Sequence, residues 1–485
     1  MQIIKPKHHF DERDFDKVQR RLHQRHVQMI AIAGTIGTGL FLGSGRAIAR
    51  AGPVGALLAY IFIGSIGYST LCSVGEMTSF APISGTFPHF AARWVDPAFG
   101  FATGWNYFYT QAMSIPVEVS AAQIIITFWD PNTKHFPAYL SVICVLVIMI
   151  NLFGVRYFGE SEFVFSIIKL TLITGLILVG LVIDLGGGPD HDRRGFRFWK
   201  HPGAINTYLE PGGLGRFLAI LGVLVQAAFS YQGMELVAIA ASETQNPRRN
   251  IKKAVQRVFF RILIFYILGI FITGLIVPYD NPNLLSGTGN AAQSPYVIAI
   301  NIAGIKVLPH IINACVFTSA FSAGNSFLFT GSRILYGLAL RGQAPAIFKY
   351  CTKAGLPLAA VLATSAFPWL AFLTVSNGAN TVFNWFVNLS TVGGFFAWLA
   401  INASYIGFYR GLKAQKIDRT KFVYYSRFQP WLAIWGVFWL TILILINGFD
   451  VFWAFTASGF LTAYINVPLV IALYVGWKVI KKTKA

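Results

Sequence analysis

Long apolar segments run through this 485-residue chain and constrain its fold more than any other feature. A helix needs about 20 mostly apolar residues to cross the hydrocarbon core of a bilayer. Continuous apolar runs of that length argue against a β-barrel, whose short strands alternate apolar and polar residues. We therefore expect an all-α polytopic membrane protein. The segments predict twelve transmembrane helices, near residues 27–48, 54–80, 100–128, 138–153, 163–184, 216–241, 257–278, 308–335, 357–376, 381–409, 430–449 and 451–477.

Composition supports the same class. Hydrophobic residues make up 55% of the chain and charged residues only 12%, whereas a soluble domain carries roughly 25% charged residues. A soluble globule of this length could not bury so much apolar side chain. The net charge of +20 would suggest nucleic acid in a soluble protein. Cytoplasmic loops of membrane proteins are rich in Lys and Arg, however, so we expect a lipid bilayer as partner and no nucleic acid.

The basic residues also predict an orientation. They gather in the N-terminal tail, in the loops after the sixth and tenth helices, and at the C-terminus. An even number of helices puts all four regions on one face, which the positive-inside rule makes cytoplasmic. The long loop 185–215 on the opposite face also carries basic residues, but long loops cross membranes largely regardless of charge. We expect a cytoplasmic tail at 1–26, a transmembrane domain at 27–477 and a cytoplasmic tail at 478–485.

Enzymatic activity is not expected. No segment is long and polar enough to fold as a separate soluble domain, and no Ser-His-Asp, Walker or zincin pattern occurs. The spacing of His23 and His26 could suit a metal ion, but a solvated basic tail is the favoured interpretation. The four cysteines show no metal-binding or disulfide pattern. We predict no catalytic residues, no metal and no cofactor.

The first expected helix contains an unusual glycine-rich stretch, Gly34–Gly45, with five glycines in twelve residues. Each glycine costs about 1 kcal/mol relative to alanine in a helix. Close helix packing through small residues explains some of them. It does not explain Gly37-Thr38-Gly39 in the middle of a span, which favours an unwound stretch. The freed N–H groups at the positive end of a half-helix would bind a carboxylate.

The sixth expected helix carries a second irregular stretch, Phe229–Glu235, which combines polar residues with Gly233 in mid-span. Interrupted helices at matching positions of two halves indicate a transporter site. The implied repeat relates residues 27–184 to residues 216–409 and leaves 430–477 outside, although identity between the halves is too weak to prove it. Freed carbonyls here would accept hydrogen bonds from an ammonium group. The two breaks together would therefore match both ends of an α-amino acid.

Four ionisable residues lie well inside apolar spans: Glu76, Glu118, Lys169 and Glu235. Each costs roughly 2.5–3.5 kcal/mol at the bilayer centre unless it is paired or hydrated. A buried pair that only fixes helix packing is one interpretation, and a proton or substrate site is the other. Glu76 lies near the cytoplasmic end of its helix, which favours a structural or gating role. Lys169 and Glu118 are our candidates for proton coupling, with Glu235 as a coupling or gating candidate.

Several motifs, taken in order, resemble amino-acid permeases of the amino acid–polyamine–organocation superfamily. They are Gly34–Gly45, Gly75-Glu76-Met77, Pro82–Phe87, Arg93–Ala98, Gly104-Trp105-Asn106 and Glu243–Arg248. The loop segments Gly186–Pro189, Gly195–Trp199 and His201–Ala204 are similar to the fungal branch of amino-acid transporters. The resemblance covers about residues 20–480. Any one motif would be weak, but the ordered set is highly specific.

The resemblance implies the 5+5 inverted-repeat fold of the leucine-transporter type, with two extra helices, and secondary transport of amino acids. In fungal members protons usually drive that transport. It also implies that Ile36, Gly37, Thr38 and Gly39 bind the substrate carboxylate. Phe229, Ser230, Tyr231 and Gly233 would bind the ammonium group and gate the site, with Glu235 nearby. Lys169 matches a lysine that takes the place of a sodium ion in sodium-coupled relatives, and Ser322 and Asn325 are candidate pocket residues only.

A proton–amino acid symporter at the plasma membrane is the leading hypothesis. An exchanger or facilitator on the same fold is the alternative. A transporter-like nutrient receptor belongs to a different class and would be expected to carry long cytoplasmic tails. The tails expected here, 1–26 and 478–485, are short, which disfavours a receptor. Which amino acid is carried cannot be read from the sequence, because the carboxylate and ammonium sites are generic.

Overall fold

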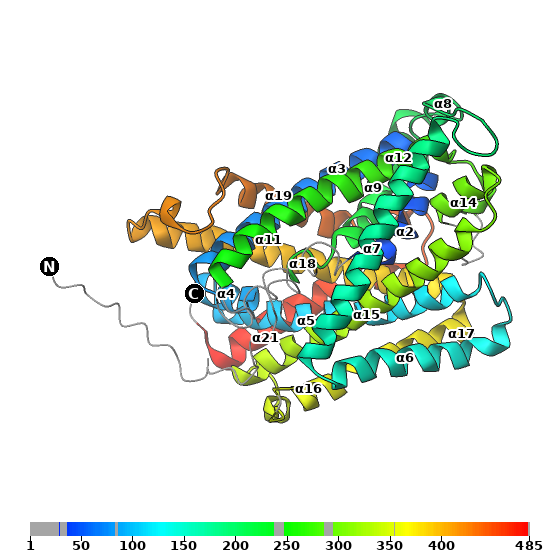
Figure 1. The fold of residues 1–485 in the computed structure, drawn as a ribbon. Coiled ribbons are helices and arrows are strands. Elements are labelled where there is room, and N and C mark those ends of the chain that lie inside the picture. The colour runs from blue at the N-terminus through cyan, green and yellow to red at the C-terminus, as the bar shows by residue number, and fades with distance from the viewer. Residues whose placement is uncertain are drawn as a thin grey trace.

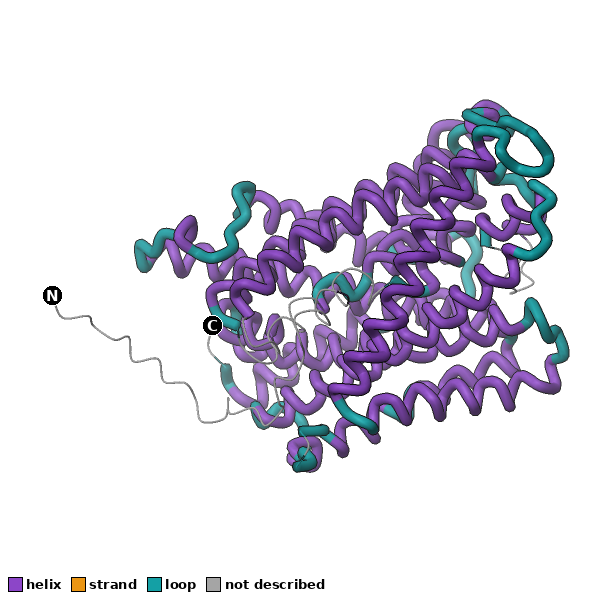
Figure 2. The backbone as a smooth tube through the Cα atoms, viewed as in Figure 1, coloured by secondary structure: helices purple, strands orange, loops and turns teal. Residues whose placement is uncertain are grey.

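The computed structural model describes residue 29 and residues 36–82, 86–236, 247–285, 294–353 and 355–483. The helices of this part pack lengthwise into one bundle (Figure 1), and Figure 2 shows that helix predominates in it and that loops connect the helices. Within the described residues, the one β feature is an isolated bridge between Leu185 and Arg193. The expected tail 1–26, the start of the first expected span and residues 237–241 of the sixth lie outside the described residues.

The helices follow the expected order along the chain. The first half contains α2 (Thr38–Phe41), α3 (Gly43–Phe80), α4 (Thr86–Trp94), α5 (Pro97–Ile126), α6 (Phe136–Leu152), α7 (Val155–Asp184) and α8 (Arg197–Lys200). The second half contains α9 (Gly212–Tyr231), α11 (Pro247–Arg261), the π-helical η4 (Ile262–Leu268), α12 (Gly269–Ile276), α13 (Pro282–Leu285), α14 (Pro295–Ile302), α15 (Leu308–Leu340), α16 (Leu358–Thr364), α17 (Leu373–Asn377) and α18 (Ala379–Ala414). The last part contains α19 (Trp431–Ile446), α20 (Ala457–Tyr464) and α21 (Asn466–Lys481).

Nine helices of the described part are long and apolar enough to cross a membrane, or up to ten if the bent pair α20–α21 is one span. The protein is thus an all-helical, multi-pass membrane protein. Its outer helices expose large apolar side chains, such as Val142 and Met149 on α6, as lipid contact requires. The central helix α5 is not among the nine, because it carries many polar residues that neighbouring helices bury.

The first two expected spans are joined without a loop. Gly52 has a φ of +74° and interrupts α3 just before Pro53. The loop from Ala204 to Asn206 satisfies the backbone at this kink, because Val54 N donates to Ala204 O at 2.9 Å and Asn206 N donates to Ala51 O at 3.1 Å. A Cβ at position 52 would lie 2.9 Å from Ala204 O, so the positive φ and the close loop both require glycine.

Two packing units position the site. α5 packs most extensively against α15 and α18, and these three long helices run close together through the bundle (Figure 1). α3 packs most extensively against α9. Three helix boundaries differ most from the expectation: α9 ends at Tyr231, α7 begins at Val155, eight residues before the expected 163, and α11 begins at Pro247, ten residues before the expected 257. Helix ends inside a bundle are set by packing and capping partners, which hydrophobicity alone does not show.

Candidate functional site

Irregular backbone lies within the glycine-rich stretch, at residues 36–37, and we call it the first break. Ile36 and Gly37 are not helical, and Gly37 is extended at φ −116° and ψ −155°. The four-residue helix α2 follows, and Leu42 separates it from α3. Ser319 Oγ of α15 donates to the carbonyl oxygen of Ile36 at 2.9 Å, which satisfies one backbone group freed by the break. Thr38 and Gly39, expected in the unwound stretch, already belong to α2.

The second break begins after α9. Phe229, Ser230 and Tyr231 form its last turn, and residues 232–235 form turns in which Gly233 takes a φ of +85°. Few side chains tolerate that backbone conformation, so glycine is required there. The break therefore starts about three residues later than the pattern at Phe229 indicated.

The helices beside the two breaks, α2 and α9, touch each other, and we call this the contact between the breaks. A Cβ at Gly39 would lie 2.9 Å from Ser230 Cα and 3.0 Å from Phe229 Cδ1. Only glycine at position 39 allows the backbones of α2 and α9 to approach so closely. The fold thus brings together two irregular segments that are nearly two hundred residues apart in sequence.

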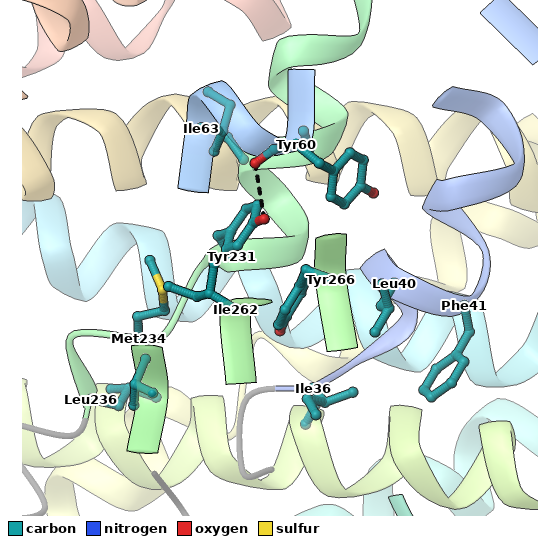
Figure 3. Close-up of a cluster of buried hydrophobic side chains, with 14 of the residues drawn as sticks. Ile36, Leu40, Phe41, Tyr60, Ile63, Tyr231, Met234, Leu236, Ile262 and Tyr266 are labelled. Carbon is teal, nitrogen blue, oxygen red and sulfur yellow. Dashed lines mark hydrogen bonds between the residues drawn. The ribbon is translucent and has the colours of Figure 1, made fainter. Parts of the chain in front are cut away.

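Tyr231 points away from this contact and anchors α9 to α3. Its hydroxyl donates to Tyr60 O at 2.9 Å, and its ring stacks on Tyr266 with centroids 4.6 Å apart (Figure 3). The Tyr60 hydroxyl in turn shares a hydrogen bond of 2.9 Å with Ser230 Oγ. The side chain of Tyr231 is therefore committed to packing, while Phe229 packs edge-on against Phe383 of α18.

Glu118 is the ionisable residue at the first break. Its Oε2 accepts hydrogen bonds from Thr38 Oγ1 at 3.0 Å and from Thr38 N at 3.4 Å. A Cβ at Gly37 would lie 2.5 Å from Glu118 Oε1, so this glycine makes room for the carboxylate. Donors that the sequence assigned to a substrate carboxylate thus hold a carboxylate of the protein itself.

Lys169 is fully buried on α7 and interacts electrostatically with two carboxylates, Glu162 and Glu118. Glu162 was not among the predicted site residues. It is also fully buried, and it accepts hydrogen bonds from Ser322 Oγ at 2.9 Å and from Asn325 Nδ2 at 3.4 Å. Ser322 and Asn325, which were candidate pocket residues, therefore contact this carboxylate. The sequence signal was obscured because the helix was expected to begin at residue 163.

Glu235 is the last residue of the second break and is held from two sides. Tyr107 OH of α5 donates to its Oε1 at 2.9 Å, and Trp398 Nε1 of α18 donates to its Oε2 at 3.0 Å. The side chain is 3% exposed. With both oxygens engaged, Glu235 links the segment after α9 to α5 and α18.

Glu76 belongs to a separate cluster at the end of α3. Its carboxylate pairs with Arg419 at 3.0 Å and accepts hydrogen bonds from Tyr405 OH at 2.9 Å and from Ser426 N at 3.0 Å. Glu76 is fully buried and Arg419 is 17% exposed. The pair attaches the loop between α18 and α19 to α3, which is a structural contact distant in sequence from both breaks.

Comparison with known proteins identifies the sequence class. The family model described as amino acid permease matches residues 26–485. The dicarboxylic amino acid permease of Saccharomyces cerevisiae is 41% identical over 96% of this chain and 78% of its own length. The proline-specific permease of Emericella nidulans is 42% identical over 96% of this chain and 86% of its own, and the lysine-specific permease of S. cerevisiae is 41% identical over 96% and 76%.

The fold is shared with more distant proteins. A crystal structure of a manganese transporter mutant from Eremococcus coleocola matches with a TM-score of 0.59, covering 94% of each chain at 14% identity. At that identity the likeness concerns the fold alone.

Proposed function

The chain belongs to the amino acid permease family, and from that premise we propose that it couples amino-acid uptake to protons by alternating access. That it is a permease and not an enzyme follows from the family. Proton symport and the roles of individual residues are what we propose beyond the family's transport activity. The observation that carries the proposal is the carboxylate of Glu118 at the donors of the first break.

Those donors suggest how substrate and proton are linked. A substrate carboxylate that enters the first break competes with Glu118 for Thr38 N and Thr38 Oγ1. A proton taken up by Glu118 neutralises its carboxylate and weakens its hold on both donors. Protonation of Glu118 thereby favours substrate binding, and substrate binding favours protonation, because the coupling is reciprocal.

Contacts between the breaks support the remaining assignments. Ile36, Gly37, Thr38 and Gly39 surround the carboxylate position, and main-chain carbonyls near Phe229, Ser230 and Gly233 receive the ammonium group. Tyr231 acts through its main chain, since its hydroxyl is engaged by Tyr60. Lys169 and Glu162 form the charge pair that responds to the state of Glu118. Glu235 holds the second break to α5 and α18 during the transport cycle.

Twelve spans and the 5+5 repeat are part of the proposal. The 38 residues of α3 would extend about 57 Å at 1.5 Å per residue, nearly twice the hydrocarbon core. The nine candidate spans count α3 as one. They become twelve when α3 is counted as one span on each side of Gly52, α5 is added, and α20–α21 is taken as one span. Both termini then lie on the basic, cytoplasmic face, and uptake into the cell makes the plasma membrane the expected location.

Proteoliposomes test the function directly. Purified protein should accumulate labelled amino acids when an inward proton gradient of about one pH unit is imposed, and should only equilibrate them without one. One proton moving down a gradient of one pH unit is worth about 1.4 kcal/mol, enough for roughly tenfold accumulation. Uptake that ignores the gradient would refute symport and favour the exchanger or facilitator.

Lys169→Ala separates coupling from binding. We expect this variant to lose proton-driven accumulation while exchange of internal for external amino acid partly survives. Lys306→Ala, at an exposed position, is the matched control and should accumulate like the wild type. Unchanged accumulation by Lys169→Ala would remove Lys169 from the mechanism.

A further inference from the structure

A cavity of about 590 Å³ lies beside α3, α9 and α18. We call it the outer vestibule; in the proposed orientation it opens to the cell exterior, because α3 leads outwards from the first break. Its lining includes Arg46, Arg50, Gln226, Asn380, Asn384 and Asp450. None of them was among the predicted site residues.

Arg46 is a cation in this cavity, and its side-chain partners in the described part of the chain are neutral. Its guanidinium donates to the side-chain oxygens of Asn380 and Asn384 and lies over the ring of Phe383, 5.2 Å from the centroid. These partners are neutral, and no carboxylate of the described residues forms a salt bridge with Arg46. A guanidinium has five N–H donors, so two amide contacts leave donors for a further acceptor.

Gln226 supplies a second donor next to it. Its Nε2 has no hydrogen-bond acceptor within the described part of the chain. A Cβ at Gly43 would lie 2.5 Å from this nitrogen, which places Gln226 against Gly43. Gly43 and Arg46 are three residues apart on α3 and share one face of that helix. The free amide and the guanidinium therefore lie on the same side of the vestibule.

Both donors lie close to the contact between the breaks. Gly43 follows Gly39 by four residues, and Gln226 precedes Ser230 by four. One helical turn, about 5.4 Å, therefore separates the Gly39–Ser230 contact from the Gly43–Gln226 contact. An amino acid whose α-carboxylate and ammonium group occupy the breaks has its side chain within about one turn of these donors.

The charge of the vestibule favours an anion. Its charged lining residues are two arginines against one aspartate, a net +1. The aspartate, Asp450, is already engaged, since Arg50 lies 3.8 Å from it and Tyr208 OH donates to it at 3.0 Å. A charged cavity with low-dielectric walls concentrates ions of the opposite sign and repels those of its own.

We propose that Arg46 and Gln226 select amino acids with an acidic side chain by binding the side-chain carboxylate, an inference that rests on the proposed transport function. Arg46 forms charge-assisted hydrogen bonds to that carboxylate, and the positive vestibule repels lysine and arginine. Overall similarity does not decide the substrate, since relatives of nearly equal identity are named for different amino acids.

Transport kinetics of the full-length protein in proteoliposomes test this inference. The Michaelis constants for L-glutamate, L-alanine and L-lysine are measured under an inward proton gradient. Wild-type protein should transport glutamate with a lower KM than lysine. In Arg46→Gln, the ratio of the glutamate KM to the alanine KM should rise about tenfold or more. Arg216→Gln is the matched control, because it removes the same charge at an exposed position of α9 that does not line the vestibule.

Asn384→Asp distinguishes anion recognition from a purely mechanical link between α3 and α18. It keeps and strengthens the contact with Arg46 but neutralises the guanidinium, so the glutamate-to-alanine KM ratio should rise as in Arg46→Gln. An unchanged ratio in both variants, or an equal KM increase for every amino acid, would overturn the inference. Wild-type protein that transports alanine but not glutamate would also overturn it and leave the proposed function standing. Failure of every amino acid would refute the proposed function and the inference with it.

Discussion

Replacing Gly39 by alanine perturbs the contact between the two breaks with a single methyl group. That carbon would lie 2.9 Å from Ser230 Cα, 3.2 Å from Ser230 N and 3.0 Å from Phe229 Cδ1. The two Ser230 atoms belong to the backbone and cannot rotate away, so α2 and α9 must move apart. Overpacking of this kind costs about 1–3 kcal/mol. If the cost falls on the substrate-binding conformation, affinity should drop about 5- to 140-fold, since 1.4 kcal/mol is a factor of ten.

Binding of labelled substrate to the purified protein, the KM for uptake and the thermal midpoint Tm measure this effect. Gly175→Ala is the matched control: Gly175 lies within α7, and a Cβ there would meet no atom within 4 Å. Because alanine favours the helix, we expect the control to be neutral or stabilised by up to about 1 kcal/mol. Wild-type substrate affinity in Gly39→Ala, together with a Tm equal to that of Gly175→Ala, would refute the close-contact reasoning.

Three further predictions concern buried and capped charges. Glu162→Gln should destabilise the protein by about 3 kcal/mol, because Lys169 loses a carboxylate partner; adding Lys169→Met should restore part of the Tm, and strictly additive losses would contradict the pairing. Glu76→Gln should cost a similar amount by breaking a buried ion pair, whereas Asp192→Asn, in an exposed pair, should cost less than about 1 kcal/mol; equal Tm losses would refute the distinction. The third prediction concerns the pKa of the Asp96 carboxyl. Burial alone would raise this pKa, but hydrogen bonds from Lys478, the Ala98 amide and Thr483 lower it below its ordinary 3.8. Asp96 therefore stabilises the fold above that pH and loses its effect as the pH falls through its lower folded value. The Tm difference between wild type and Asp96→Asn should accordingly shrink below about pH 4, and a difference that grew in acid would contradict this sign.

Local properties of the chain made much of the fold predictable. Hydrophobicity over about 20 residues is enough to identify a membrane span, and nine or ten such helices are present among the described residues. The clustering of glycines predicted the extended backbone at Ile36 and Gly37. A glycine among polar residues predicted the interruption near Gly233. The family followed from ordered motifs, which are also local.

Helix boundaries were less predictable, and one of them concealed a site residue. Glu162 precedes the expected start of its span at residue 163, yet α7 begins at Val155 and buries this carboxylate against α15. A polar residue near a helix end has the same sequence signature whether water or a partner helix satisfies it. Hydrophobicity therefore could not reveal Glu162.

The sequence by itself determined that this protein is a membrane-spanning permease with two interrupted helices and several buried charges. Only the tertiary structure decided which groups these features meet. Thr38 and Glu118, 80 residues apart, share hydrogen bonds at the first break, and Arg46 meets Asn380 and Asn384 more than 330 residues away. Such contacts depend on where and at what angle helices cross. The positions and angles of these crossings are set by the packing of the whole bundle. They cannot be read from residue type and local spacing alone.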